Sequence, residues 1–425
     1  MTRAAPAPIG FDAATLAQLL ERLARFSADG PGVTRFTYDD AWCEAQRWLR
    51  AEAKARGLEA TVDAAGNLLL HDAAVRPGQA GPLLMVGSHL DSVRHGGRYD
   101  GAYGTIAGLM LAAAHRGRTG MPVVGFVTCE EEQSRFDSHM MGARSLIGSV
   151  TAFELDSVRD AAGTTWRTAL ADMRAHGCAA ALAPGNHPFA PPFTATIQLE
   201  LHIEQGPVLE AARLELGIVE HIAGYRRIRA HLTGEARHSG TTPMALRNDA
   251  LAAAAEIVLA AEALAVETGE QAVATAGNAR VQPALYNVVP GECELWLEVR
   301  HAEAGALDRL ARTLAERATA IARRRGVELV LEPVSQQDPT ALSGEFAGEA
   351  EALAREHGVR CQRMTSGAAH DSMEFARAGA RSLMLFVPSR GGVSHSPDEF
   401  TEIADLWRGV EFASALIERV TGGAR

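Results

Sequence analysis

Apolar residues along this chain follow two patterns: short continuous runs, and longer segments in which they recur every three or four positions. Residues 12–57 show the second pattern, which "SADGPGVTRF" interrupts. Beyond them, runs such as "GPLLMVGSH", "PVVGFVTCEEE" and "FTATIQLELHIEQG" alternate with helical segments, one of them from about Gly104 to His115. Buried strands separated by helices are typical of an α/β fold, so the pattern predicts a central mixed sheet flanked by helices.

The pattern changes after His202. Residues 218–233 alternate in the manner of a strand, "TTPMALRNDALAAAAEIVLAAEALAVE" predicts a long helix, "GECELWLEVRH" a strand and "AGALDRLARTLAERATAIARRRG" a further helix. This order indicates an inserted α+β domain over residues 218–334. The flanking parts, 1–217 and 335–425, then form one discontinuous domain, which ends in the strand "SLMLFVPS", a loop and a C-terminal helix.

The loop "RGGVSHSPDEF" carries a helix-start signal. Its run "SPDE", from Ser396 to Glu399, fits a capping box with proline at the first helical position. The sequence therefore predicts that a helix begins there, directly after His395.

Composition and charge narrow the class of protein. The chain has 425 residues, of which 47% are hydrophobic and 22% charged, and this suits two or three globular domains. No window reaches the ~18 uninterrupted apolar residues of a membrane span, because Glu256 and Glu262 interrupt the Ala-rich run that comes nearest. A net charge of −11 disfavours nucleic acid as a partner. The single lysine, Lys54, lies in a helical stretch with no sign of a Schiff-base or phosphate site.

Two further features bear on location and on thiolate chemistry. The first twenty residues lack the apolar core of a secretory signal, so we expect a cytoplasmic protein. The cysteines are scattered and never form a CxxC pair, which argues against a disulfide framework and against a thiolate zinc site. They are Cys43, Cys129, Cys178, Cys293 and Cys361.

Side chains able to bind metals follow four of the expected strands, at the end where ligands gather in open α/β sheets. They are His89 and Asp91, then Glu130, Glu131 and Glu132, then His202 and Glu204, and finally His395, with Asp100 of "HGGRYDG" as a further candidate. A single histidine after a strand is more often a packed core residue, and three successive glutamates are more often a solvated helix start. Coincidence at four strand ends nevertheless favours a shared metal site in the discontinuous domain.

The donor types restrict that metal. Imidazole and carboxylate without thiolate suit Zn, Mn, Co or Ni. Three histidines and two carboxylates exceed what one catalytic ion with an open position takes. Two ions about 3.5–4 Å apart that share a carboxylate fit better, because such a pair can activate a bridging water and polarise a carbonyl.

Two carboxylates are left for supporting roles. Asp91 follows His89 by two residues on the same face of an extended segment, so we expect it to orient that imidazole. One member of the run 130–132 is left as a general base, and spacing alone does not say which.

A set of motifs in a fixed order carries a resemblance to a known family. They are "GSHLDSV", "GGRYDG", "EEEQSRF", "GARSLIG", "ELHIEQGPVLE", "RHSGTTPM", "NVVPG", "SGAAHDS" and "PSRGGVSHSPDE". Over nearly its whole length the chain resembles the M20-type dinuclear metallohydrolases, and within them the amidase, hydantoinase/carbamoylase branch. That branch contains N-carbamoyl-L-amino acid hydrolases, allantoate amidohydrolases and β-ureidopropionases.

The resemblance assigns the metal ligands and the base. It places His89 and His202 on one ion, Glu132 and His395 on the other, and Asp100 between them. It makes Glu131 the general base, but Gln133 stands where the family has glycine, so a shift to Glu130 as base and Glu131 as ligand stays open. His202 favours the amidase branch, because the peptidase branches usually have an acidic ligand there.

The resemblance also assigns substrate contacts. In the inserted domain, which it makes a lid and dimerisation domain, Arg300 anchors the substrate carboxylate, while His238 and Asn287 hydrogen-bond the developing oxyanion. Gln205 holds the ureido group, and His370 lies in a loop near the substrate, next to Asp371. Two plainer interpretations stay open: a surface ion pair for Arg300 and a cap for the helix near Pro243 for His238. Ala369 stands where the family has glycine.

These residues lead to one expected function and three alternatives. We expect a homodimeric hydrolase with two divalent ions per chain, acting on carbon–nitrogen bonds of linear amides. It removes the carbamoyl group from an N-carbamoyl-L-amino acid or a related ureido acid and releases ammonia and CO2. The alternatives are an allantoate amidohydrolase, a peptidase or N-acyl-amino-acid deacylase, and a non-catalytic binding protein. The sequence leaves the particular ureido acid and the native metal open.

Overall fold

The chain divides into two compact units. The computed structural model describes residues 10–78, 81–269 and 271–422. The first unit comprises Met1–Glu220, Ala341–Met364 and His370–Arg425, and the second comprises His221–Thr340 and Thr365–Ala369. The second junction falls after residue 340 rather than 334, because strand β12 (Glu328–Gln337) pairs with its neighbour as far as Gln337. No sequence pattern indicated that 365–369 would join the second unit.

The first unit is built on a nine-stranded mixed sheet, which confirms the predicted α/β class. Its strands are β1 (Glu59–Val62), β2 (Leu68–His71), β3 (Leu84–His89), β4 (Val123–Thr128), β5 (Ile197–Ile203), β6 (Leu216–Ile222), β13 (Thr340–Ala341), β14 (Cys361–Ser366) and β15 (Arg381–Val387). The order is β1-β2-β4-β3-β5-β15-β6-β13, and β14 pairs with β6. The four central strands β4, β3, β5 and β15 run parallel, so their carboxyl ends meet at one edge.

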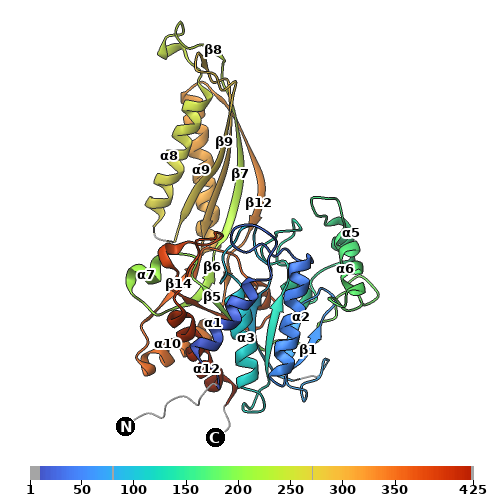
Figure 1. The fold of residues 1–425 in the computed structure, drawn as a ribbon. Helices are drawn as coiled ribbons and strands as arrows, with labels where there is room; N and C mark the ends of the chain where they lie inside the picture. The colour runs from blue at the N-terminus through green and yellow to red at the C-terminus, as the bar shows by residue number, and fades with distance from the viewer. Residues whose placement is uncertain (1–9, 79–80, 270, 423–425) are drawn as a thin grey trace. The chain divides into compact units, whose positions relative to one another are not determined.

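Helices cover this sheet (Figure 1). They are α1 (Ala13–Ala24), α2 (Asp40–Ala55), α3 (Ala102–Ala114), α4 (Met141–Leu146), α5 (Ala152–Ser157), α6 (Trp166–Ala175), α7 (Val208–Ala212), α10 (Gly344–His357), α11 (Ser372–Arg377) and α12 (Ile403–Thr421), with a 3-10 turn η2 (Arg390–Gly392). In α1 the Asp12 side chain caps the N-terminus by accepting the Thr15 N–H at 2.8 Å. Its leucines repeat at helical spacing and are buried, as the pattern predicted.

Helix α3 packs so closely on the sheet that its glycines approach the backbone of the strands. A Cβ on Gly104 would come within 2.2 Å of the Leu201 carbonyl oxygen, and one on Gly108 within 2.5 Å of that of Val86. Glycine at these two positions is therefore what lets the helix contact β3 and β5 so closely. Because α3 begins two residues after Asp100, this packing fixes the end of the loop that carries Asp100.

The second unit is an antiparallel sheet covered by two helices on one face (Figure 1). The sheet order is β12-β7-β11-β9, with β7 (Gly224–Thr233), β9 (Val273–Gln282) and β11 (Glu292–His301), and the helices are α8 (Ala250–Thr268) and α9 (Ala304–Arg324). Alternate residues of β11 are buried, because only one face of the strand packs against the two helices. A small two-stranded ladder, β8 (Arg237–His238) with β10 (Val288–Val289), and a 3-10 turn, η1 (Met244–Leu246), complete the unit.

Within the described ranges, none of the helices combines the length and the apolar character needed to cross a bilayer.

Candidate metal centre

Three predicted ligands meet at the carboxyl edge of the central sheet. His89 is the last residue of β3, and His202 lies near the end of the adjacent parallel strand β5. Their Nε2 atoms lie 3.5 Å and 3.1 Å from Oδ1 of Asp100. All three side chains are buried, so they form a group enclosed by the first unit.

A second group forms on the other oxygen of Asp100. His395 Nε2 lies 3.2 Å from Asp100 Oδ2 and 3.4 Å from Glu132 Oε2. The His395 side chain is 51% exposed, whereas the Asp100 side chain is only 5% exposed. Asp100 thus offers one oxygen to a buried group and the other to a group that reaches the surface.

The free atoms of these side chains fit a divalent cation in each group. Nε2 of His202 and Oε1 of Glu132 are buried, and neither has a hydrogen-bond partner among the described residues. The 3.1 Å approach of His202 to Asp100 is therefore a close contact without hydrogen-bond geometry, as expected for two donors aimed at a common point. In each group the three donor atoms lie within 4.8 Å of one another.

The ring orientation of the buried histidines supports the same fit. Nδ1 of His89 is bonded to the Asp91 backbone oxygen at 2.9 Å, and Nδ1 of His202 to that of Ile203 at 2.8 Å. A carbonyl partner requires the proton on Nδ1, so the Nε2 lone pair of each ring is free to bind a metal.

Electrostatics point to cations as well. Burial and the charge of nearby Asp100 raise the pKa of Glu132 to about 8, and burial raises the pKa of Glu131 well above its usual range. Although burial alone would raise the pKa of Asp100, its close contacts with the three histidine rings hold it well below its usual range. So many carboxyl groups in one buried place are stable as anions only with positive charge between them.

The geometry separates the three glutamates of the run 130–132. Glu130 has a left-handed backbone, with φ of 53°, and its Oε1 accepts the N–H groups of Arg135 at 2.9 Å and Phe136 at 2.5 Å. Glu131 instead places Oε2 3.9 Å from His89 Nε2, and Glu132 belongs to the second group. The pairing of Glu131 with Glu132 fits this arrangement, whereas Glu130 is occupied in closing a turn.

Gln133 occupies a backbone conformation that explains the glycine of the family pattern. Its φ is 52°, in the left-handed region that glycine adopts at least cost. Its Nε2 lies 3.2 Å from Nδ1 of His139.

The closest contact between Asp91 and His89 runs through the Asp91 main chain rather than its carboxylate. The partner of His89 Nδ1 is the Asp91 backbone oxygen, while the nearest carboxylate oxygen is 3.9 Å away. That carboxylate instead accepts the N–H of Glu131 at 3.2 Å and the N–H of Glu132 at 3.1 Å. Asp91 therefore holds one ligand through its main chain and the glutamate pair through its side chain.

The helix predicted after His395 is absent from the described structure. The helix α12 begins at Ile403, behind Glu402, and the segment 396–399 forms a turn in which the Ser396 hydroxyl accepts the Asp398 N–H at 3.2 Å. Glu399 does not reach back to cap a helix. Its carboxylate accepts backbone N–H groups from the Asp100 loop, a contact that sequence reasoning missed.

Two predicted substrate residues also lie at this edge. Gln205 Nε2 donates to Asp100 Oδ2 at 2.8 Å, and its Oε1 is buried without a hydrogen-bond partner in the described part of the chain. His370 is buried, its ring centroid 4.6 Å from that of His202 and its Nδ1 3.7 Å from Glu131 Oε1. Burial, reinforced by His202, lowers the pKa of His370 well below its usual range, so its ring is neutral at this position.

In the second unit, His238 ends β8 and Asn287 directly precedes β10, and both side chains are exposed. The Asn287 backbone oxygen accepts the Ser239 N–H at 3.0 Å. Nδ1 of His238 accepts the N–H of Gly240 at 3.1 Å and that of Thr241 at 3.3 Å, so the ring also orders the turn after β8.

Arg300 lies at the opposite end of β11. Its guanidinium donates to Glu298 at 2.6 Å and to the Gly367 carbonyl at 2.5 Å. The contact with Glu298 is the kind of ion pair expected if Arg300 is a structural residue. The nine residues from Glu292 to Arg300 span eight steps of strand, which correspond to roughly 26 Å. The structure therefore does not bring His238 and Asn287 of this unit together with Arg300.

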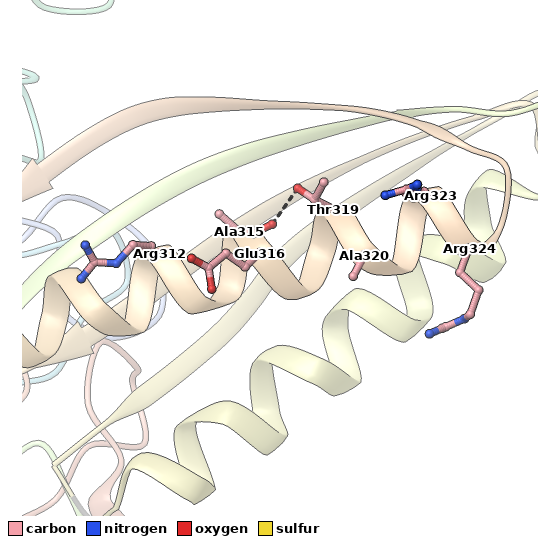
Figure 2. Close-up of a pocket in the computed structure, with 7 residues that line it drawn as sticks. All are labelled: Arg312, Ala315, Glu316, Thr319, Ala320, Arg323 and Arg324. Carbon is pink, nitrogen blue, oxygen red and sulfur yellow. Dashed lines mark hydrogen bonds between the residues drawn. The ribbon is translucent and has the colours of Figure 1, made fainter.

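Two described cavities lie away from the metal-ligand candidates. One of about 760 Å³ lies along α9, and Figure 2 shows that all the side chains lining it, from Arg312 to Arg324, come from that helix. Another of about 290 Å³ lies on the sheet of the second unit beside Arg227 and Trp296. Neither is connected by shared residues to the groups around Asp100.

Known proteins resemble the chain over almost its full length. The family described as "Peptidase family M20/M25/M40" matches residues 85–419. An N-carbamoyl-L-amino-acid amidohydrolase of Paenarthrobacter aurescens is 37% identical over 92% of this chain and 94% of its own, and an allantoate amidohydrolase of Bacillus subtilis is 33% identical over 96% and 97%. A crystal structure of an amidase of the hydantoinase/carbamoylase family from Burkholderia multivorans has a TM-score of 0.88 at 29% identity, covering 96% of this chain and 98% of that one.

Proposed function

This chain belongs to the peptidase family M20/M25/M40 and to its hydantoinase/carbamoylase branch, and from that premise we propose that it removes the carbamoyl group from an N-carbamoyl-L-amino acid or a related ureido acid. It is a hydrolase of carbon–nitrogen bonds other than peptide bonds in linear amides. Allantoate is the second candidate substrate, favoured by the relative of Bacillus subtilis.

The observation that carries the proposal is the pair of donor groups joined through Asp100. In the proposed centre His89 and His202 would hold one divalent ion, Glu132 and His395 would hold a second, and Asp100 belongs to both donor groups. Zn or Mn suits these donors. Bound there, the ions supply Lewis acidity, which polarises the substrate carbonyl and makes a water molecule acidic enough to react.

Glu131 moves the proton in this proposal. Its carboxylate lies beside His89 and is held by the contact of its N–H with Asp91. From that position it takes a proton from the attacking water and delivers it to the leaving nitrogen. An N-carbamoyl amino acid then yields the amino acid, CO2 and ammonia.

Substrate contacts complete the proposal. The buried Oε1 of Gln205 accepts an N–H of the ureido group, because it has no other partner in the described structure. Arg300 has the planar fork that suits a carboxylate. His238 and Asn287 donate to the carbonyl oxygen as negative charge develops there. His370, next to Glu131, also contacts the substrate in this proposal.

The proposed assembly is a homodimer through the second unit. A ureido acid is far shorter than the roughly 26 Å of strand between the two ends of β11. One substrate molecule therefore cannot contact both Arg300 and His238 of the same copy. The separation supports a dimer in which each site takes one of these contacts from the partner subunit.

Ammonia release from a substrate panel tests the proposal. The protein is stripped with a chelator, reloaded with Mn or Zn, and offered N-carbamoyl-L-amino acids, N-carbamoyl-β-alanine and allantoate. We expect turnover only after reloading, with carbamoyl amino acids or allantoate preferred. Dipeptides and acetyl amino acids are assayed by amine release. Their faster hydrolysis would overturn the proposed substrate class. No turnover of any compound would favour a binding protein.

A further inference from the structure

We propose that Glu399 is a positioning residue that fastens the loop carrying Asp100 to the loop carrying His395 and so sets the affinity of the second donor group for its ion. The inference rests on the proposed metal centre and deepens it.

The Glu399 carboxylate joins segments that are about three hundred residues apart in the chain. It is 3% exposed. Its Oε1 accepts the N–H of Tyr99 at 2.9 Å and the N–H of Asp100 at 3.2 Å, while its Oε2 accepts the Ser394 hydroxyl at 2.9 Å. Hydrogen bonds to a buried carboxylate are among the stronger ones in proteins, so this one group links both ligand loops.

The Asp100 loop is shaped around this carboxylate. A Cβ on Gly97 would lie 1.9 Å from the carboxyl carbon of Glu399 and 2.0 Å from its Oε1. Any larger residue at 97 would displace the carboxylate from the N–H groups that it accepts. Gly97 of "HGGRYDG" is thus needed for the close approach of this loop to Glu399.

The contacts of Glu399 continue to the metal-facing atoms. Ser394, bonded to Glu399, also places its hydroxyl 3.3 Å from Asp100 Oδ2, the oxygen that faces His395. His395 itself has φ of 53°, in the left-handed region that residues other than glycine rarely adopt. Holding Ser394 therefore helps to hold the next residue in a strained but ligand-competent conformation.

Glu399 is not itself a ligand in this arrangement. It belongs to neither group of converging donor atoms found among the described residues. Both of its oxygens already accept hydrogen bonds from the protein. Its role is exerted through Asp100, Ser394 and His395.

The test measures metal affinity on Glu399→Gln and Gly97→Ala, without any substrate. Chelator competition followed by metal analysis reports the two ions of each variant. We expect the ion of the second donor group to bind about 10–100-fold less tightly in both variants, with the affinity of the first group for its ion unchanged. At saturating metal, kcat should return towards the wild-type value with KM unaltered.

Asp63→Asn is the matched control. Asp63 is a buried carboxylate of the same unit that accepts the N–H groups of Ala65 at 2.9 Å and Asn67 at 2.8 Å, rather than groups of the Asp100 and His395 loops. It should lower the thermal unfolding midpoint and leave metal affinity unchanged. If Glu399→Gln does not fold, Ser394→Ala removes only the hydroxyl and should show a smaller loss of affinity for the same ion.

The outcomes are distinguishable. A lower unfolding midpoint with unaltered metal affinity in the Glu399 and Gly97 variants overturns the positioning role. A wild-type protein that binds two ions but hydrolyses no ureido acid contradicts the proposed function and leaves the Glu399 comparison readable. A wild-type protein that binds no divalent ion overturns both.

Discussion

The two units present their polar residues in opposite ways. In the first unit the ligand candidates are mostly buried, and His89, His202 and Asp100 each have a further hydrogen bond that fixes them. In the second unit His238 is exposed on a two-residue ladder, and Arg300 is engaged with Glu298. The candidate ligands are thus brought together within one unit, whereas His238 and Arg300, the proposed substrate contacts of the second unit, lie far apart on it. Changes in the first unit should alter metal binding and chemistry, and changes in the second unit should alter substrate capture.

The sharpest test of this division is Glu131→Gln. Loss of the proton carrier should lower kcat by about 10³-fold, with metal content unchanged, because Glu131 belongs to neither donor group. Steady-state kinetics and metal analysis check this. Glu130→Gln is the matched control. It should weaken the turn before Phe136 and lower the thermal stability, with a much smaller effect on kcat. An inactive Glu131 variant that has lost an ion would instead make Glu131 a ligand.

A mixing experiment tests whether the second unit acts in the partner subunit. His238→Ala alone should lower kcat/KM by about 10²-fold. Refolding it with an equal amount of Glu131→Gln should restore about a quarter of wild-type activity, because half of the dimers are mixed and each has one intact site. No recovery in dimers shown to be mixed would place His238 in its own subunit's site and break the comparison.

Arg300→Gln tests substrate capture within one chain. Without its guanidinium, KM for a carboxylate substrate should rise by about 10²-fold with little change in kcat. The matched control is Arg227→Gln, because Arg227 also pairs with Glu298 and also lies over the Tyr225 ring. An equal rise of KM in both variants would reduce Arg300 to a structural ion pair.

The smallest effect on activity is expected at His115, in the core of the first unit. Burial lowers the pKa of His115 to about 4 from its usual 6.5. Because the unfolded chain takes up this proton first, stability should fall as pH drops from 6.5 to 4, by at most about 3 kcal/mol. In His115→Gln the denaturation free energy should depend less steeply on pH across that window, with turnover at neutral pH unchanged. An unaltered slope would contradict the shift.

Local pattern predicted the fold and the position of the site. Continuous apolar runs mark the parallel strands β3, β4 and β5, and parallel strands bring their last residues to one edge. For that reason His89, Glu132 and His202 could be grouped by their positions in the sequence. The base and ligand order within 130–132 could not be assigned in this way, because it depends on a left-handed turn at Glu130 and on which side chain closes it.

Contacts that span the chain were beyond such reasoning. The run "SPDE" fits a capping box, but Glu399 has better partners three hundred residues away, and tertiary contacts outweigh a local signal. Asp91 contacts the expected neighbour most closely through its backbone carbonyl, which has no sequence signature. The engagement of Arg300 with Glu298 reflects cross-strand geometry that spacing in one strand does not specify.

The position of Asp100 gives metal exchange a direction. It is joined to α3 by one residue, Gly101, whose φ is 63° and where a Cβ would lie 2.4 Å from the His89 ring. Moving Asp100 away from the buried group would require displacing a helix packed against the sheet backbone. His395, half-exposed on a loop, can swing away without that cost. In the proposed two-ion centre, the ion of the second donor group should therefore leave first and return last, so that a chelator removes metal in two kinetic phases.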